Sequence, residues 1–126
     1  MNSEMDLQII QKQIQKIEED LQSFIMQKIE ASNILDSINE IKKDARVFSP
    51  IGGGVYVDSK VNSTKFMINL GSKTFTERSK TEVIGLLKNR IKEIEKLENK
   101  KTKELEKLAK QGQQIHEKLI QNVRKN

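Results

Sequence analysis

Few residues in this sequence have the types and spacing that catalysis or metal binding requires, and the clearest candidates are a histidine and a glutamate near the C-terminus. His116 is the only histidine, and Glu117 follows it directly. In zinc proteases such a pair opens a helical motif that a second histidine completes four residues after the first. Here that position is Ile120, which cannot bind a metal. We therefore interpret His116 as a surface residue of a helix, and we expect no metal site and no cofactor.

Two glycine-containing segments share only isolated features with phosphate-binding loops. Gly52-Gly53-Gly54 lacks the following lysine and hydroxyl residue of a P-loop and the third glycine of a dinucleotide-binding fingerprint. Gly71-Ser72-Lys73-Thr74 lacks the upstream glycine and a contiguous Gly-Lys-Thr. Tight turns explain both segments better. Because no nucleophile lies beside a general base either, we predict that the protein is not an enzyme.

Two long segments flank these turns, and in both of them apolar residues recur at intervals of three and four residues. In the first segment they are Leu7, Ile10, Ile14, Ile17, Leu21, Phe24, Ala31, Leu35, Ile38 and Ile41. In the second they are Ile84, Leu87, Ile91, Ile94, Leu105, Leu108, Ile115 and Leu119. This spacing is typical of the a and d positions of a coiled coil. It predicts helices at residues 4–45 and 79–124, the second of which starts at a capping box formed by Ser79 and Glu82.

The two repeats mirror each other when the chain is folded back on itself, which predicts a long antiparallel coiled-coil hairpin. Ile41 then pairs with Ile84, at one end of the apolar seam. Lys28 interrupts the first repeat, and the position that faces it in the second is Glu98. We expect these two side chains to lie opposite each other midway along the arms, where an ion pair fixes register more than it adds stability.

Composition agrees with elongated helices that bury one narrow apolar seam. The 126 residues are 35% hydrophobic and 33% charged, with no Trp and a single Tyr, which is little aromatic mass for a compact core. The absence of Cys excludes disulfides and thiolate metal sites. No apolar run approaches the roughly 20 residues of a membrane span, and the acidic N-terminal segment does not fit a signal peptide. We expect a single domain, residues 1–126, in a cytoplasmic protein without a membrane partner.

Charge is distributed unevenly along the chain. Residues 1–46 hold 6 basic and 9 acidic side chains, whereas residues 80–126 hold 13 basic and 7 acidic ones. A basic second arm is compatible with nucleic-acid binding, and equally with a solvated helix attracted to an acidic sister helix. Acidic residues interrupt the basic ones throughout this arm, and aromatic stacking residues are absent from it. Nucleic acid is therefore an unlikely partner.

The segment between the arms, residues 46–78, has the pattern of two consecutive β-hairpins. Short β-prone runs at 47–49, 55–57, 65–70 and 73–77 are separated by turn signals, and Phe66, Ile68 and Leu70 alternate onto one face. Two hairpins cannot close a core of their own, and their bare edges invite pairing with other chains. The sequence thus predicts an α+β fold, mainly α, whose hairpins are completed by other subunits.

The residues from Pro50 to Val57, which read Pro-Ile-Gly-Gly-Gly-Val-Tyr-Val, closely resemble the hallmark of the α-class subunits of prefoldin. The later Ile68-Asn69-Leu70-Gly71 is similar to the family's second strand-and-glycine element, and two hairpins match the α class, since the β class has one. The sequence departs from the family at residues 58–60, where a glycine is common.

This resemblance implies a hexamer of two α and four β subunits, of archaeal rather than eukaryotic type. It implies that the hairpins assemble into an intersubunit β-barrel platform from which the coiled coils extend. The implied activity is ATP-independent capture of unfolded polypeptides and their delivery to a group II chaperonin. The candidate oligomerisation residues are Phe48, Pro50, Ile51, Val55, Tyr56, Val57, Phe66, Ile68, Leu70 and Phe75.

Apolar residues remain near the free ends of the arms after the seam is assigned. They are Met1, Met5, Ile9, Ile120 and Val123, and the seam residues Leu7, Ile10 and Leu119 become accessible if the ends fray. Flexible Met and Ile side chains suit sequence-tolerant binding, so we expect clients to bind here. The alternative interpretation is that Ile9 and Ile120 widen the seam.

Two other functions stay open at this point. The same hairpins suit a structural homo-oligomer or a filament without β-class partners. The basic second arm leaves nucleic-acid binding as the third and least supported interpretation.

Overall fold

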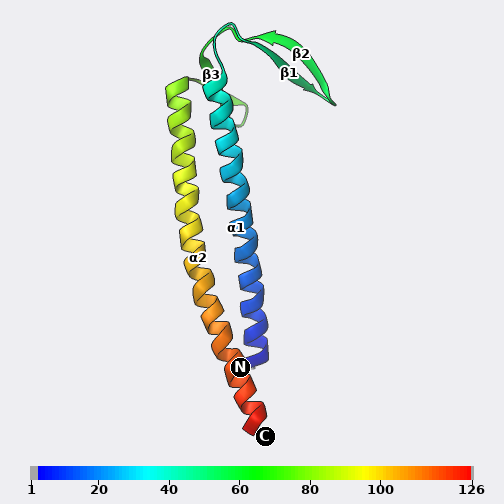
Figure 1. Cartoon of the computed structure of the whole chain (residues 1–126), viewed down its shortest axis with the longest axis vertical. Helices are drawn as coiled ribbons and strands as arrows, with labels where there is room; N and C mark the ends of the chain where they lie inside the picture. The colour runs from blue at the N-terminus through cyan, green and yellow to red at the C-terminus, as the bar shows by residue number, and fades with distance from the viewer. Residues whose placement is uncertain (1–2, 126) are drawn as a thin grey trace. The chain divides into compact units, whose positions relative to one another are not determined.

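The computed structural model describes residues 3–125 and contains two long helices and four short strands. Helix α1 (Ser3–Glu40) is followed by strands β1 (Arg46–Gly52), β2 (Val55–Lys60), β3 (Lys65–Gly71) and β4 (Thr74–Ser79), and then by helix α2 (Lys80–Lys125) (Figure 1). This confirms the expected α+β class, mainly α. The described residues fall into two compact units, which are 3–29 with 92–125, and 30–91.

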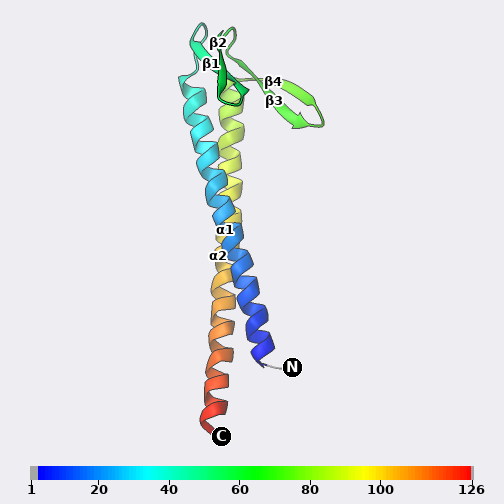
Figure 2. The same cartoon turned by 90° about the vertical axis from the view of Figure 1, so that its right-hand side faces the viewer.

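The first unit is an antiparallel pair of helical segments, one from each helix, that lie side by side (Figures 1 and 2). Its buried apolar side chains are Ile10 and Ile17 of α1 and Ile94 of α2, all at predicted seam positions. Gly112 is also buried, and a Cβ placed there would lie 3.5 Å from Cγ2 of Ile10. One stripe of each helix is therefore buried, and the remaining faces stay open.

Charged side chains interrupt the seam in this unit and confirm the predicted pairing of Lys28 with Glu98. Nζ of Lys28 lies 2.6 Å from Oε1 of Glu98, and the two side chains are only 31% and 18% exposed. Two turns further toward the N-terminus of α1, Asp20 lies 3.8 Å from Nζ of Lys101. Because the residue number falls from 28 to 20 on α1 while it rises from 98 to 101 on α2, the helices are antiparallel.

The second unit joins the remaining helical segments to the strands, and here the predicted end of the first helix was wrong. Helix α1 ends at Glu40, not at residue 45. Nζ of Lys80 donates to the carbonyl oxygens of Asn39 (3.1 Å) and Ile41 (3.4 Å), which the helix leaves without intrahelical partners. Asp44 has a φ of 70°, in the left-handed region, and its N–H donates to the Val61 carbonyl at 2.7 Å. The chain thus leaves the helix to join the end of β2.

The start of α2 confirms Ser79 as the predicted cap, but the Glu82 carboxylate contacts the Ser79 hydroxyl and not the Ser79 backbone N–H of a full capping box. The N–H of Glu82 donates to Oγ of Ser79 at 3.2 Å, and the Ser79 hydroxyl donates to Oε1 of Glu82 at 3.1 Å. Ser79 itself closes β4, so the sheet ends where the helix begins. The cap satisfies one of the backbone donors at the helix N-terminus.

The strands form two separate antiparallel sheets, β1–β2 and β3–β4, of equivalent construction. In the first, Pro50 pairs with Tyr56, and the register then shifts before Gly52. In the second, Asn69 pairs with Phe75, and the same shift precedes Gly71.

A two-residue turn with positive φ at both positions closes each hairpin. The first turn is Gly53-Gly54 (59° and 80°), and the second is Ser72-Lys73 (49° and 62°). Such pairs are typical of type I′ turns, whose twist matches that of the flanking strands. The second hairpin therefore repeats the first, displaced by 19 residues along the chain.

The ion pair in the seam predicts the outcome of a double-mutant cycle. Replacing Lys28 alone by Leu leaves the largely covered Glu98 carboxylate without its partner, and we expect a loss of about 1 kcal/mol of stability. Replacing both residues by Leu removes both charges, so we expect stability equal to or above that of the natural chain. Thermal unfolding followed by circular dichroism at constant protomer concentration measures both. A double variant less stable than the Lys28→Leu variant would contradict this account.

Candidate functional site

Each hairpin exposes one apolar residue at each of three equivalent positions, namely the middle of its first strand, the residue at the register shift and the aromatic of its second strand. In the first hairpin these are Phe48, Ile51 and Tyr56, and in the second they are Met67, Leu70 and Phe75. All six side chains are between 57% and 71% exposed. We call these two sets the hairpin triads. Such concentrated apolar exposure on a small element is a mark of an interaction surface.

Strand pairing places part of each triad on a common face. Residues directly opposite each other in an antiparallel pair project to the same side, so Tyr56 lies on the face that carries Pro50 and Phe48. By the same rule Phe75 lies on the face that carries Met67. The sequence analysis did not name Met67 as a candidate. It could have been found by aligning the two hairpin segments, because Met67 follows Phe48 by the 19 residues that separate equivalent positions.

The other predicted hairpin residues are placed as follows. Phe66 and Ile68 are half-buried on the opposite face of the second hairpin, whereas Leu70 lies at the register shift and is exposed. Leu70 therefore does not continue the face of Phe66 and Ile68, because the shift breaks the two-residue alternation. Val55 and Val57 are exposed in β2.

Ion pairs occupy the end of each hairpin that is nearer the helices. In the first hairpin the guanidinium of Arg46 donates three hydrogen bonds to the Asp58 carboxylate, among them Nε to Oδ1 at 2.8 Å. Next to them, Nζ of Lys60 lies 3.4 Å from Oδ1 of Asp44. In the second, Lys65 lies 3.9 Å from Glu77. The hydrogen bonds from Arg46 hold the pKa of Asp58 below its ordinary value. Each hairpin is thus polar at its base and apolar toward its turn.

A second group of exposed apolar residues lies at the free ends of the helices. Met5 and Ile9 of α1 are 59% and 51% exposed, and Ile120 and Val123 of α2 are 39% and 76% exposed. The seam does not cover these four side chains. Of the three predicted seam residues, Ile10 is buried and Leu7 is half-buried, whereas Leu119 is half-buried and also lines the groove described next. Met1 lies outside the described residues.

The end of α2 forms a shallow groove of about 370 Å³ that no residue of α1 lines. Its lining residues, which recur at helical spacing over two turns of one face, are His116, Leu119, Ile120, Val123 and Arg124. The last turns of α2 extend past the first residues of α1 in both views of the molecule (Figures 1 and 2). We call this feature the end groove.

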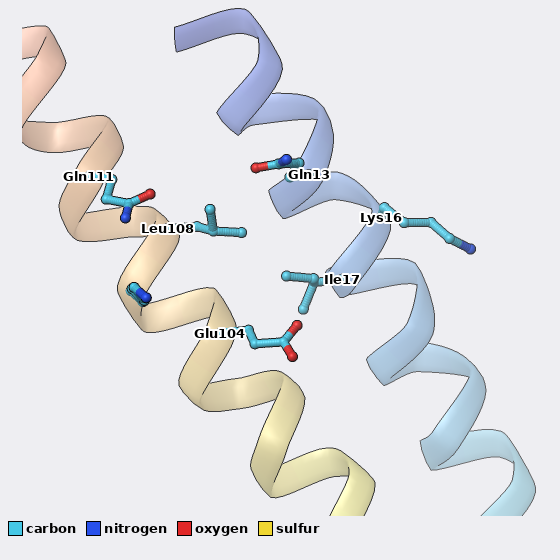
Figure 3. A pocket seen from close by; sticks show the side chains of 7 residues that line it. Gln13, Lys16, Ile17, Glu104, Leu108 and Gln111 are labelled. Carbon is cyan, nitrogen blue, oxygen red and sulfur yellow. The ribbon is translucent and has the colours of Figure 1, made fainter. Parts of the chain in front are cut away.

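A second groove, of about 450 Å³, lies between the helices of the first unit. Ile17 of α1 and Leu108 of α2 point toward each other at its floor, and Gln13, Glu104 and Gln111 surround them (Figure 3). Its apolar floor is the seam itself. The sequence did not predict this groove, because heptad spacing places Ile17 and Leu108 in the seam without showing how far the polar residues beside them cover it.

Within residues 3–125, no group of three or more His, Cys, Asp or Glu side chains is placed to hold a metal ion. No helix in the same range combines the length and apolar character that crossing a membrane requires.

Comparison with known proteins decides the family. The model of the family described as prefoldin subunit matches residues 10–125. The chain belongs to the prefoldin family. It is 31% identical to prefoldin subunit alpha 1 of Methanocaldococcus jannaschii over 96% of this chain and 85% of that protein. It is 32% identical to prefoldin subunit alpha of Archaeoglobus fulgidus over 94% of this chain and 90% of that protein.

Solved prefoldin structures share the fold. Filamentous PFD from Methanocaldococcus jannaschii, solved by cryo-EM, superimposes with a TM-score of 0.74 at 17% identity and covers 91% of this chain and 95% of that one. The crystal structure of the prefoldin beta subunit from Thermococcus strain KS-1 superimposes with a TM-score of 0.67 at 19% identity, covering 97% and 90%. Two helices with hairpins between them are thus a prefoldin arrangement, and prefoldin is a family of chaperones.

The Arg46–Asp58 contact predicts a pH dependence. Because the pKa of Asp58 is lowered, the contact is fully formed above the ordinary aspartate pKa and is lost as pH falls through the lowered value. A carboxyl titration by NMR should place the Asp58 midpoint below the ordinary range of an aspartate. Arg46→Gln should return it to the ordinary range, and an unchanged midpoint in that variant would contradict the assignment.

Proposed function

We propose that this chain is a subunit of an ATP-independent chaperone that captures unfolded polypeptides at the free ends of its helices. The observation that carries the proposal is the end groove, whose exposed Ile120 and Val123 continue an apolar seam that α1 no longer covers. Exposed Met5 and Ile9 add flexible apolar surface at the start of α1. Flexible apolar side chains accept many sequences, as a chaperone for unfolded chains requires.

The hairpins support a role in assembly with β-class prefoldin subunits. A two-stranded sheet has two open edges and is marginal alone in water, so the triads and edges need partners. The family resemblance implies two α and four β subunits joined through a β-barrel platform, and we adopt that arrangement. Independence of ATP is supported by the glycine segments, which form turns between paired strands and not phosphate-binding loops.

Delivery of captured clients to a group II chaperonin in the cytoplasm completes the proposal, and its support is the family resemblance. The first test is co-purification, which identifies the subunit and the large complex that accompany the chain.

A filament or homo-oligomer built from this chain alone is the second candidate. One solved prefoldin of similar fold is described as filamentous, and equivalent hairpins suit repeated contacts between copies. Native mass separates the candidates. A discrete complex that forms only with a β-class subunit favours the chaperone hexamer, whereas long assemblies of the chain alone favour the filament.

Charged substitutions in the hairpin triads should disrupt assembly. Tyr56→Asp and Phe75→Asp each remove an aromatic that we expect to be buried between subunits, which costs about 1.5–3 kcal/mol before the burial of charge is counted. We expect a lower mass by light scattering and unchanged helicity by circular dichroism. Ser63→Asp is the matched control, since it adds the same charge between the hairpins and retains an acceptor for the Lys65 N–H. Unchanged mass in both triad variants would argue against the assembly role.

Polar substitutions at the helix ends should weaken client capture and leave assembly intact. A variant with Ile9, Ile120 and Val123 replaced by Ser loses exposed apolar surface without touching the buried seam, so the complex should keep its mass. Suppression of client aggregation, measured by turbidity, should fall several-fold. Met26→Ser is the control, because Met26 is 61% exposed in the middle of α1. Full activity of the triple variant, or an equal loss in the control, would refute binding at the ends.

A further inference from the structure

The end groove combines an apolar floor with positive charge. Leu119, Ile120 and Val123 form the floor, His116 lines the groove beside them, and Arg124 supplies the positive charge. Arg124 makes no ion pair with any other residue between positions 3 and 125. Its guanidinium is therefore available to a ligand that occupies the groove.

The surrounding helix adds to this charge. Residues 113–125 of α2 contain three basic side chains and one acidic one, Glu117. Glu117 accepts a hydrogen bond from Gln113 at 3.5 Å and does not line the groove. Positive charge therefore predominates over the last turns of α2.

An apolar side chain held on this floor brings its neighbours in sequence close to Arg124. A carboxylate at that place is attracted by the guanidinium and binds more tightly, whereas an ammonium group is repelled by it. We propose that the end groove selects, among unfolded segments, those in which apolar residues are flanked by Asp or Glu. This inference rests on the proposed function, and it names the class of client that this chain prefers.

A second copy of the chain is the other occupant to consider, because the start of α1 is also apolar and acidic, with Met5 and Asp6. In that segment Leu7 is half-buried and Ile10 is buried in the seam of its own unit, so of its apolar residues only Met5 and Ile9 stay exposed. The groove spans two turns, roughly 12 Å of helix, which about four residues of extended chain match. An unfolded segment of that length can place its apolar side chains on the floor, whereas the helix end keeps Leu7 and Ile10 in its own seam, so the unfolded segment fits the groove better.

The test measures affinity of the assembled complex for unstructured fluorescent peptides that share one apolar core and differ only in flanks of Asp, Ser or Lys. Anisotropy titrations at low salt should rank Asp above Ser above Lys, with about a two- to five-fold step for each exposed charge contact. Added salt should reduce the differences in affinity between the three peptides, because it screens the charge contacts.

Arg124→Gln should abolish the difference between Asp and Ser flanks, while Arg124→Lys should keep most of it. Arg90→Gln is the matched control, since it removes the same charge from α2 outside the groove and should leave the ranking unchanged. Ile120→Ser should weaken all peptides, because the shared apolar core loses its floor.

Equal affinity for all flanks would overturn the charge preference and leave the proposed chaperone function standing. Failure of every peptide to bind, together with no suppression of aggregation, would instead refute the proposed function. An acidic preference that survives Arg124→Gln places the selectivity elsewhere and overturns the assignment to this groove. Self-association of complexes that Arg124→Gln abolishes, without any effect on peptide ranking, would assign the groove to a second copy.

Discussion

The apolar stripe that each helix buries against the other is the interaction on which the rest of this structure depends. A stripe at heptad spacing covers only one side of a helix, so each helix contributes a narrow buried surface and leaves its other faces to solvent. Ile10, Ile17 and Ile94 are buried in one unit, and Ala31, Ile38 and Val83 are buried in the other. The ion pair between Lys28 and Glu98 interrupts the stripe and favours one register, because a shifted register separates these two charges.

The narrow seam between the helices buries none of the hairpin triads, so these apolar side chains stay exposed. Each hairpin satisfies the backbone hydrogen bonds of one ladder and leaves two edges and an apolar triad uncovered by the other residues that the structure describes. Cross-strand ion pairs lie at the bases, and the exposed apolar residues of the triads lie nearer the turns. The repetition of bulge, glycine and turn presents similar surfaces twice, which suits assembly with several neighbouring subunits.

The ends of the helices follow from the same constraint. A heptad stripe stays buried only where a partner helix runs beside it, and α2 continues past the start of α1. The apolar residues of its last turns therefore line an open groove, with Arg124 at the edge. A surface of this kind binds through apolar area and modest electrostatic preference, which is compatible with capture of many different unfolded chains.

The sequence by itself determined the features that depend on local pattern. Heptad spacing specified the two helices and their pairing, Ser79 and Glu82 specified the start of the second helix, and the glycine segments specified two hairpins. The tertiary structure decided what depends on residues distant in sequence. At the end of helix α1, Nζ of Lys80 donates to the Asn39 carbonyl, and the Asp44 N–H donates to the Val61 carbonyl. These two contacts between distant residues explain why the helix ends at Glu40. The register shift in the second hairpin moves Leu70 off the face that its spacing predicts. The end groove exists because α2 extends beyond the start of α1. Periodicity specifies which side of a helix is buried, but not where its partner helix ends.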